Sequence, residues 1–287
     1  MVVETENEEE RSVHIVHWFR SKGLRFHDQP SLYQVILRLK QHQQQLIAEG
    51  KKVAQSSWRC IYLLDPWFAS SSSSVNKWQF LLQSLEDLDC NLRRMGSRLF
   101  VIRGQPAHIF PALFREWHTT HLTFETDPEP YGKVRDAKIS KLCQDFNVQV
   151  NSCTSHTLYN LDDILNKCPT GTPYPLTFTS FQGIVQMLDT PPLPCPAIDA
   201  KLVEGVIYTP VVDDHDQRYG VPVLSDLGFR TKNYNSSSKW PGGETEALLR
   251  LERHLQHKAW VAAFGKPKMT PNSLMGLTQT GLSPYLR

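Results

Sequence analysis

Short apolar runs alternate with amphipathic helical patterns through the first half of the chain, and this alternation is what most limits its fold. The runs are nearly continuous rather than alternating polar and apolar, which is typical of parallel strands covered on both faces. Strands are expected at Val13–Phe19, Cys60–Leu64, Leu99–Ile102 and His121–Glu125, with a fifth at Val148–Val150. Parallel strands with helical crossovers predict an α/β fold built on a doubly wound, five-stranded parallel sheet.

Helical patterns fill the intervals between these runs. A glutamine-rich amphipathic stretch, 32–58, predicts the first crossover helix. In 75–96, apolar residues recur at steps of three and four until Gly96 supplies a stop. Two further helices are expected within 106–117 and 132–147.

Composition and short motifs exclude several classes of protein. The net charge of +2, with 40% hydrophobic and 21% charged residues, suits a globular protein and is too mild for a concentrated nucleic-acid surface. No apolar run approaches the roughly 18 residues of a membrane span. The six cysteines form no C-x-x-C pair, which predicts buried free thiols in a reducing compartment and no metal site. The loop after the first strand has neither dinucleotide nor P-loop glycines, which argues against dehydrogenases and NTPases.

Charged and aromatic residues follow the predicted strands at their carboxyl ends. They are Arg20, Asp65–Trp67, Arg103–Pro106 and Glu125–Pro130. Ligands bind doubly wound sheets at this edge, so these residues are candidates for a site. The alternative is that they are only the polar loops that any strand-to-helix connection carries.

The second half has a different character and predicts three parts of the chain. Nine of the nineteen prolines lie between Pro169 and Pro222, which favours extended chain over helix. The predicted parts are an α/β domain over 12–155, an extended connector over 156–240, and the beginning of an all-α domain, with its first helix, over 241–287.

The last eight residues, "TGLSPYLR", predict the start of a further helix. Ser283 is a favoured N-cap, and Pro284 fits a first helical turn. Only three residues follow that proline, so the chain is expected to stop where this helix begins.

Several long motifs, in order, carry a resemblance to a known family. They include "LLDPWFA", "RLFVIRGQPA", "EPYGKVRDA", "SHTLY", "DDHDQRYGVP", "WPGGETEALLRLERHL" and "TGLSPYLR". The chain resembles the photolyase/cryptochrome flavoproteins along nearly its whole length, and most closely the animal cryptochromes of the repressor type. The resemblance implies the photolyase-type N-terminal α/β domain, with the chain truncated at the start of the FAD-binding helical domain.

The resemblance also implies a cofactor site. The residues that would receive the FAD diphosphate are Thr280, Gly281, Leu282 and Ser283. Free N–H groups at a helix start suit a phosphate, although the same residues would also serve as a plain helix cap. Most of the helical domain would lie beyond Arg287, so FAD binding by this chain alone is expected to be weak or absent. No antenna chromophore is expected, because Lys77 and Gln79 stand where the family carries arginines.

A docking surface for protein partners is the second site that the resemblance implies. In repressor cryptochromes a groove beside the antenna pocket receives a PAS domain of the clock activator, with the serine loop Ala69–Val75 as its rim. The matching residues here are Glu129, Tyr131, Gly132 and Arg135. Alternatively, Arg135 only pairs with Asp136 or Glu129 on a solvated helix.

Three functions remain open at this point. The first is a light-independent circadian transcriptional repressor that contacts clock activator PAS-domain proteins, period proteins and an F-box ubiquitin ligase subunit, in nucleus and cytoplasm, without membrane contact. The second is a (6-4) DNA photolyase that uses FAD and blue light, the only reading in which DNA is a partner. The third is an α/β interaction fragment without flavin.

Overall fold

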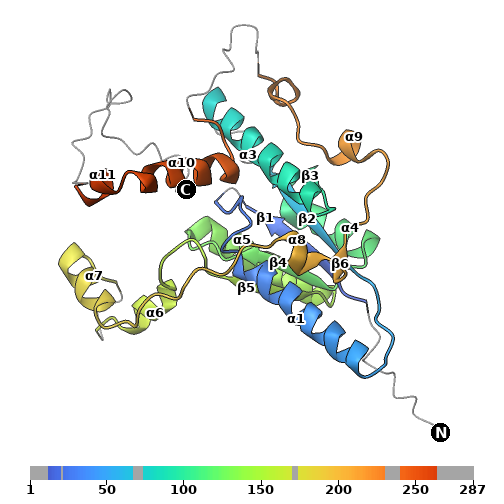
Figure 1. Ribbon diagram of the computed structural model, residues 1–287, viewed down its shortest axis with the longest axis horizontal. Coiled ribbons are helices and arrows are strands. Elements are labelled where there is room, and N and C mark those ends of the chain that lie inside the picture. The colour runs from blue at the N-terminus through green and yellow to red at the C-terminus, as the bar shows by residue number, and fades with distance from the viewer. Residues whose placement is uncertain (1–11, 21, 67–73, 170–173, 230–239, 264–287) are drawn as a thin grey trace.

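A computed structural model describes residues 12–20, 22–66, 74–169, 174–229 and 240–263. Within these residues, six strands form one parallel sheet with helices on both faces (Figure 1). The strands are β1 (His14–Phe19), β2 (Ser56–Leu64), β3 (Leu99–Arg103), β4 (His121–Glu125), β5 (Gln149–Cys153) and β6 (Ile207–Tyr208). The order β3-β2-β1-β4-β5 confirms the predicted doubly wound parallel sheet.

The five predicted strands are all present, and a sixth joins them from the predicted connector. Strand β6 pairs with the first residues of β2, with Ser56 opposite Ile207. Strand β2 therefore begins four residues before the predicted Cys60. The polar start of β2 escaped prediction because Ser56 and Ser57 look like turn residues, yet both are buried in the sheet.

Four long helices connect the strands. They are α1 (Pro30–Ala48), α3 (Val75–Arg94), α4 (Pro106–Glu116) and α5 (Pro130–Asp145). Proline at the first position of α1, α4 and α5 fits a helix start, where the missing N–H is not needed. The side chain of Ser74 caps α3 by accepting from the Lys77 N–H, and Gly96 follows its C-terminus at φ +70°.

The sheet separates two apolar cores. Alternate residues of β1 face opposite sides, with Ile15 and Phe19 toward α1 and α3, and Val16 and Trp18 toward α4 and α5. Three side chains of the predicted connector complete the first core: Ile198, Val203 and Val206. This burial on both faces explains why the strands read as continuous apolar runs.

The segment predicted as an extended connector contains short helices as well as extended chain. They are α6 (Leu161–Asn166), α7 (Phe178–Val185), α8 (Ala200–Val203), α9 (His215–Tyr219) and the 3-10 helix η2 (Leu224–Leu227). His215 at the start of α9 is buried and bonds the Leu99 carbonyl at 3.0 Å. Local caps such as Asn160 and Thr177 start helices that proline content alone did not predict.

In the described residues that follow position 240 there are two helices, rather than the one expected. Helix α10 (Glu244–Gln256) and helix α11 (Lys258–Ala262) are separated at His257, where φ is −90° and ψ is 64°. Neither helix buries a side chain among the described residues. They lie with α6 and α7 on the left side of the view in Figure 1.

The cysteines differ from the sequence expectation. All six thiols are free, but only Cys60 and Cys143 are buried, and Cys90 is exposed. Burial raises the pKa of the Cys143 thiol to about 12, so it stays protonated and acts as a small apolar side chain.

Candidate functional site

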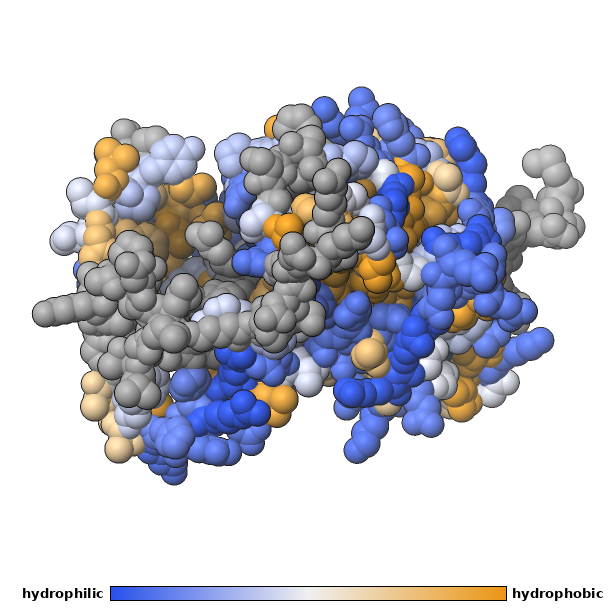
Figure 2. Space-filling model, turned by 90° about the horizontal axis from the view of Figure 1, so that it is seen from above, coloured by the Kyte–Doolittle hydropathy of each residue, from blue (hydrophilic) through white to orange (hydrophobic). Residues whose placement is uncertain are grey.

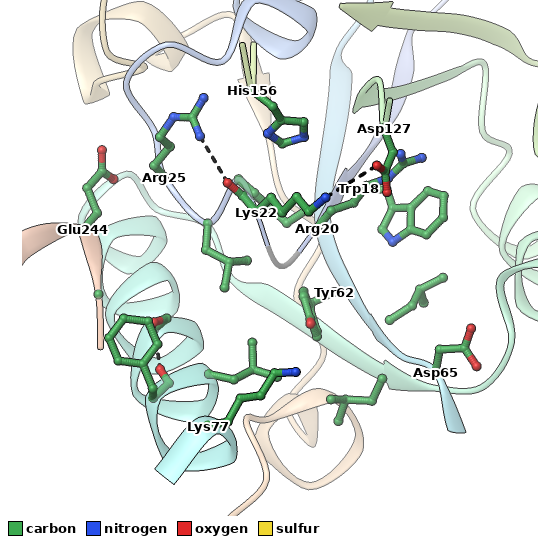
Figure 3. A pocket seen from close by; sticks show the side chains of 18 of the residues that line it. Trp18, Arg20, Lys22, Arg25, Tyr62, Asp65, Lys77, Asp127, His156 and Glu244 are labelled. Carbon is green, nitrogen blue, oxygen red and sulfur yellow. Dashed lines mark hydrogen bonds and ion pairs between the residues drawn. The ribbon is translucent and has the colours of Figure 1, made fainter. Parts of the chain in front are cut away.

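A cavity of about 610 Å³ lies at the carboxyl ends of β1 and β2. Its walls come from α3, α5, α10 and the loop after β1, and Figure 3 shows Glu244 on the side opposite Trp18 and Asp65. This is the edge where doubly wound sheets bind ligands, and the volume falls in the range of ligand pockets. All four strand ends singled out from the sequence contribute a lining residue: Arg20, Asp65, Pro106 and Asp127.

The part of the cavity next to α3 is apolar. It is formed by Leu24, Tyr62, Trp78 and Leu81, of which Tyr62 and Trp78 belong to the buried core. Burial raises the pKa of Tyr62 well above its ordinary value, so its hydroxyl stays neutral. Lys77 also lines this part, and its side chain extends along the cavity in Figure 3.

An ion-pair network fixes the opposite wall. Asp136 on α5 accepts from Arg20 Nη1 at 2.8 Å and from Arg135 Nε at 3.1 Å. Arg135 Nη2 also donates to Asp127 Oδ2 at 3.2 Å. Burial would raise the pKa of Asp127, but the Glu129 N–H and the charges of Lys22, Arg135 and Arg20 outweigh it and lower the pKa. Asp127 therefore stays ionised, and its ion pair with Arg135, together with the pairs that Asp136 makes, holds both arginines in place.

The two arginines of this network lie against aromatic rings. The guanidinium of Arg20 lies 4.3 Å from the ring centre of Trp18 and 4.4 Å from that of Phe124. Arg135 lies 5.2 Å from Trp18 and 5.9 Å from Tyr131. Cations over aromatic faces are attracted electrostatically, so ring stacking and ion pairs orient the same groups.

The predicted docking residues occupy one side of the cavity. Glu129, Tyr131 and Arg135 line it, whereas Gly132 is buried behind them. A Cβ atom at position 132 would lie 2.3 Å from Asp127 Cγ, so only glycine allows this approach. Arg135 does pair with Asp136, as expected if it were only a surface ion pair. Its side chain is only 13% exposed, however, so this part of the helix is not a solvated face. Glu129 pairs with Lys22 instead.

The predicted rim of that surface and the predicted cofactor residues fall mainly outside the described residues. Of the serine loop Ala69–Val75, only Ser74 and Val75 are described. Trp67 and the four FAD candidates Thr280, Gly281, Leu282 and Ser283 also lie outside.

The loop after β1 forms a wall that sequence reasoning did not include. Arg25 donates to Glu125 Oε1 at 3.1 Å, and Gly23 packs so closely on Glu125 that a Cβ atom would collide with the carboxylate. His156 Nε2 lies 3.7 Å from the other carboxylate oxygen, and burial lowers the pKa of His156 despite that neighbour. No spacing in the sequence predicts these contacts, because Arg25 and Glu125 are far apart along the chain.

Other classes of site find no support among the described residues. Within them, no group of three histidine, cysteine, aspartate or glutamate side chains could hold a metal ion. No helix that the structure describes is both long and apolar enough to cross a membrane. A flavin needs convergent walls that bury most of it, and α10 and α11 bury none of their own side chains.

Comparison with known proteins places this sheet and its edge in one family. The DNA photolyase family model matches residues 15–197, and the chain belongs to that family. It is 52% identical to Cryptochrome-1 of Rattus norvegicus over 276 residues, which are 96% of this chain and 43% of the relative's length. It is 50% identical to Cryptochrome-2 of Gallus gallus over 95% of this chain and 43% of that protein. The expected membership and the resemblance to animal cryptochromes are therefore confirmed.

Solved structures show the same fold at much lower identity. A bacterial class III photolyase from Agrobacterium tumefaciens aligns over 98% of this chain and 52% of its own, with a TM-score of 0.69 and 19% identity. A Synechocystis cryptochrome aligns over 89% of this chain and 49% of its own, with a TM-score of 0.65 and 17% identity. The chain spans less than half the length of these curated relatives.

Proposed function

We propose that this chain is a cryptochrome-type protein that acts through protein contacts, with the cavity at the strand ends as its docking surface. The partner that docks there is a PAS domain of a clock activator, and the outcome is light-independent repression of circadian transcription. Similarity to animal cryptochromes supports the type of function, and the geometry of the cavity wall supports the docking surface.

One observation carries the proposal: an oriented arginine lies beside a half-exposed aromatic at the cavity. Tyr131 is 48% exposed, whereas Arg135 is held from behind by Asp127 and Asp136. Tyrosine and arginine dominate the energetics of protein interfaces when they are rigid and surrounded by contacts that exclude water. The ion pairs supply that rigidity before the partner arrives, which lowers the entropic cost of binding.

Further features of the proposal follow the family. Period proteins and an F-box ubiquitin ligase subunit are additional partners, and the protein works in the nucleus and the cytoplasm. FAD is the cofactor that the family resemblance implies, and a similar archaeal photolyase from Sulfolobus tokodaii holds FAD molecules in its crystal structure. For this chain alone we propose weak or absent FAD binding, and a cavity that receives a protein side chain rather than an antenna chromophore.

The test is a calorimetric titration of the chain with a purified PAS-domain fragment of a clock activator. The variants are Tyr131→Ala and Arg135→Ala, because both side chains line the cavity. Loss of a central interface residue costs about 2 kcal/mol or more, so the affinity of each variant should fall at least ~30-fold.

Lys133→Ala is the matched control, since Lys133 is an exposed cation on the same helix and does not line the cavity. Thermal melts of all variants separate lost docking from lost folding. Equal affinities for wild type, Tyr131→Ala and Lys133→Ala would refute the docking surface.

A (6-4) photolyase is the second candidate, because the matching family model is that of DNA photolyase. It predicts light-dependent repair of (6-4) lesions by the flavin-loaded chain. Failure of PAS binding together with lesion repair under blue light would favour this candidate. Failure of both would leave the flavin-free interaction fragment.

A further inference from the structure

The cavity is built across two parts of the chain that lie more than 200 residues apart. One wall is the loop 22–29, which supplies Leu24, Arg25 and His27. The facing wall is the start of α10, which supplies Gly243, Glu244, Ala247 and Leu248. The contacts that hold α10 in place therefore also close the cavity on that side.

The loop is anchored independently of α10. Phe26 is buried against Phe19, with ring centres 5.7 Å apart, and Gln29 Nε2 donates to the Gly23 carbonyl at 2.8 Å. The Phe26 ring and the Arg25–Glu125 ion pair attach the loop to the sheet, and the Gln29 bond joins the two ends of the loop. The loop is thus a fixed support, and α10 is the element that must be docked onto it.

Helix α10 has no comparable apolar anchor. None of its apolar side chains is buried, and three of its leucines, Leu248, Leu251 and Leu255, are 41–55% exposed. Its attachment is polar and lies at its N-terminus. Gly242 N–H donates to Gln83 Oε1 at 3.0 Å, and Thr245 N–H donates to Asp87 Oδ2 at 3.1 Å.

Glu244 makes the most extensive of these contacts. Its carboxylate accepts from the Phe26 N–H at 2.8 Å, from the His27 N–H at 3.2 Å, and contacts the His27 ring nitrogen. The Glu244 side chain is only 10% exposed, so these bonds are shielded from water. Hydrogen bonds to a charged group are stronger than neutral ones, and losing the acceptor leaves two backbone donors unpaired.

The geometry points to Glu244 as a positioning residue: it docks α10 on the loop after β1 and so completes the wall of the partner cavity. The effect on partner binding rests on the function proposed above. Docking of α10 itself does not, because the contacts belong to the free chain. A partner that fills the cavity should in turn hold α10 in place, since binding to one wall is linked to closure of the other.

The test compares Glu244→Ala with Glu246→Ala by hydrogen exchange of the full chain. Both carboxylates lie in the first turn of α10, so both variants lose the same favourable interaction with the helix dipole. Glu246 pairs with Arg250 on its own helix rather than with the loop. In Glu244→Ala, exchange of the α10 amides and of the Phe26 and His27 amides should rise about tenfold or more. Amides of β1 and β2 should not change.

A conservative series sharpens the result. Glu244→Gln retains one oxygen that can accept from the loop, so its exchange rates should lie between those of wild type and Glu244→Ala. PAS affinity in the titration described above should fall in the same order. Unchanged α10 exchange in Glu244→Ala, or an equal rise in Glu246→Ala, would overturn the assignment. If wild type does not bind a PAS domain at all, the proposed function fails while the exchange data still decide the role of Glu244.

Discussion

The sheet region and the α10–α11 segment differ in how far their apolar side chains are buried. The sheet buries large apolar groups on both faces, among them Trp58, Phe110 and Phe124, all at 2% exposure or less. The segment buries none and is attached through hydrogen bonds at its start. Apolar atoms lie open to the surface at the end of the molecule that carries α7 and α11 (Figure 2). Burial of apolar groups therefore stabilises the fold of the sheet region, whereas the position of α10 depends on its contacts with that region.

The largest expected effect lies in the sheet core. Phe110→Ala removes a fully buried ring that packs edge-on against Trp18, and it should cost about 3–5 kcal/mol of unfolding free energy. Leu255→Ala on α10, where the side chain is 55% exposed, should change it by less than about 0.5 kcal/mol. Urea denaturation followed by far-UV circular dichroism measures both. Similar losses of unfolding free energy for the two variants would contradict the difference in burial between the sheet and α10.

Removing the partner of a buried charge should cost nearly as much unfolding free energy as removing a buried ring. Asp136→Ala leaves Arg20, which is 7% exposed, without its carboxylate partner. Breaking a buried pair from one side should cost about 3 kcal/mol, the low end for such pairs, because Asp127 can still hold Arg135. The same denaturation series checks this value, and a loss below about 1 kcal/mol would show that water reaches the network.

Acid should weaken the sheet region through His17. Burial, together with the nearby charge of Arg20, lowers the pKa of His17 to about 3 from 6.5. The unfolded chain therefore takes up a proton below pH 6.5 that the folded chain refuses, so stability falls as the pH drops toward the folded pKa. By pH 5 the loss should reach roughly 2 kcal/mol. In His17→Gln, which removes the titrating ring, the change in unfolding free energy between pH 7 and pH 5 should be smaller by that amount.

A smaller effect than those in the sheet is expected where α10 begins. Gly243 has φ +121°, and a Cβ atom there would lie 2.7 Å from Asp87 Cβ. Gly243→Ala should weaken docking of α10 by about 1–2 kcal/mol while the sheet keeps its stability. Limited proteolysis of α10 reports this. Gly205→Ala is the control, since Gly205 also has positive φ but has open space around it. Faster cleavage of α10 in both variants would mean that backbone strain at a distant glycine loosens α10 as much as the contact at Gly243 does.

The sheet was predictable because burial on both faces leaves a direct signal in local sequence. Strand β4 was predicted at its observed bounds, His121–Glu125, and the other strands within a few residues. Strand β6 was missed because two residues carry no periodicity, and the break at His257 left no glycine or proline to mark it. The predicted division at 155, 240 and 287 remains a proposal.

The site was less predictable than the sheet. Strand ends indicated where a cavity would form, and family motifs supplied Glu129, Tyr131 and Arg135. The roles of Trp18 and Glu244 were not predicted, because each depends on partners distant in the sequence. Glu244 accepts a hydrogen bond from Phe26, which lies 218 positions away in the sequence, and no local pattern predicts such a contact.

The most direct test of the central claim is the flavin content of the purified chain. We propose that this chain works through protein contacts on its sheet region and binds FAD weakly or not at all, because the side chains of α10 and α11 are not buried against further walls. Absorption in the flavin bands, compared with protein absorbance, gives the molar ratio after purification in the presence of FAD. We expect a ratio far below one. A stoichiometric, tightly held flavin would contradict it and return light-driven chemistry to the leading position.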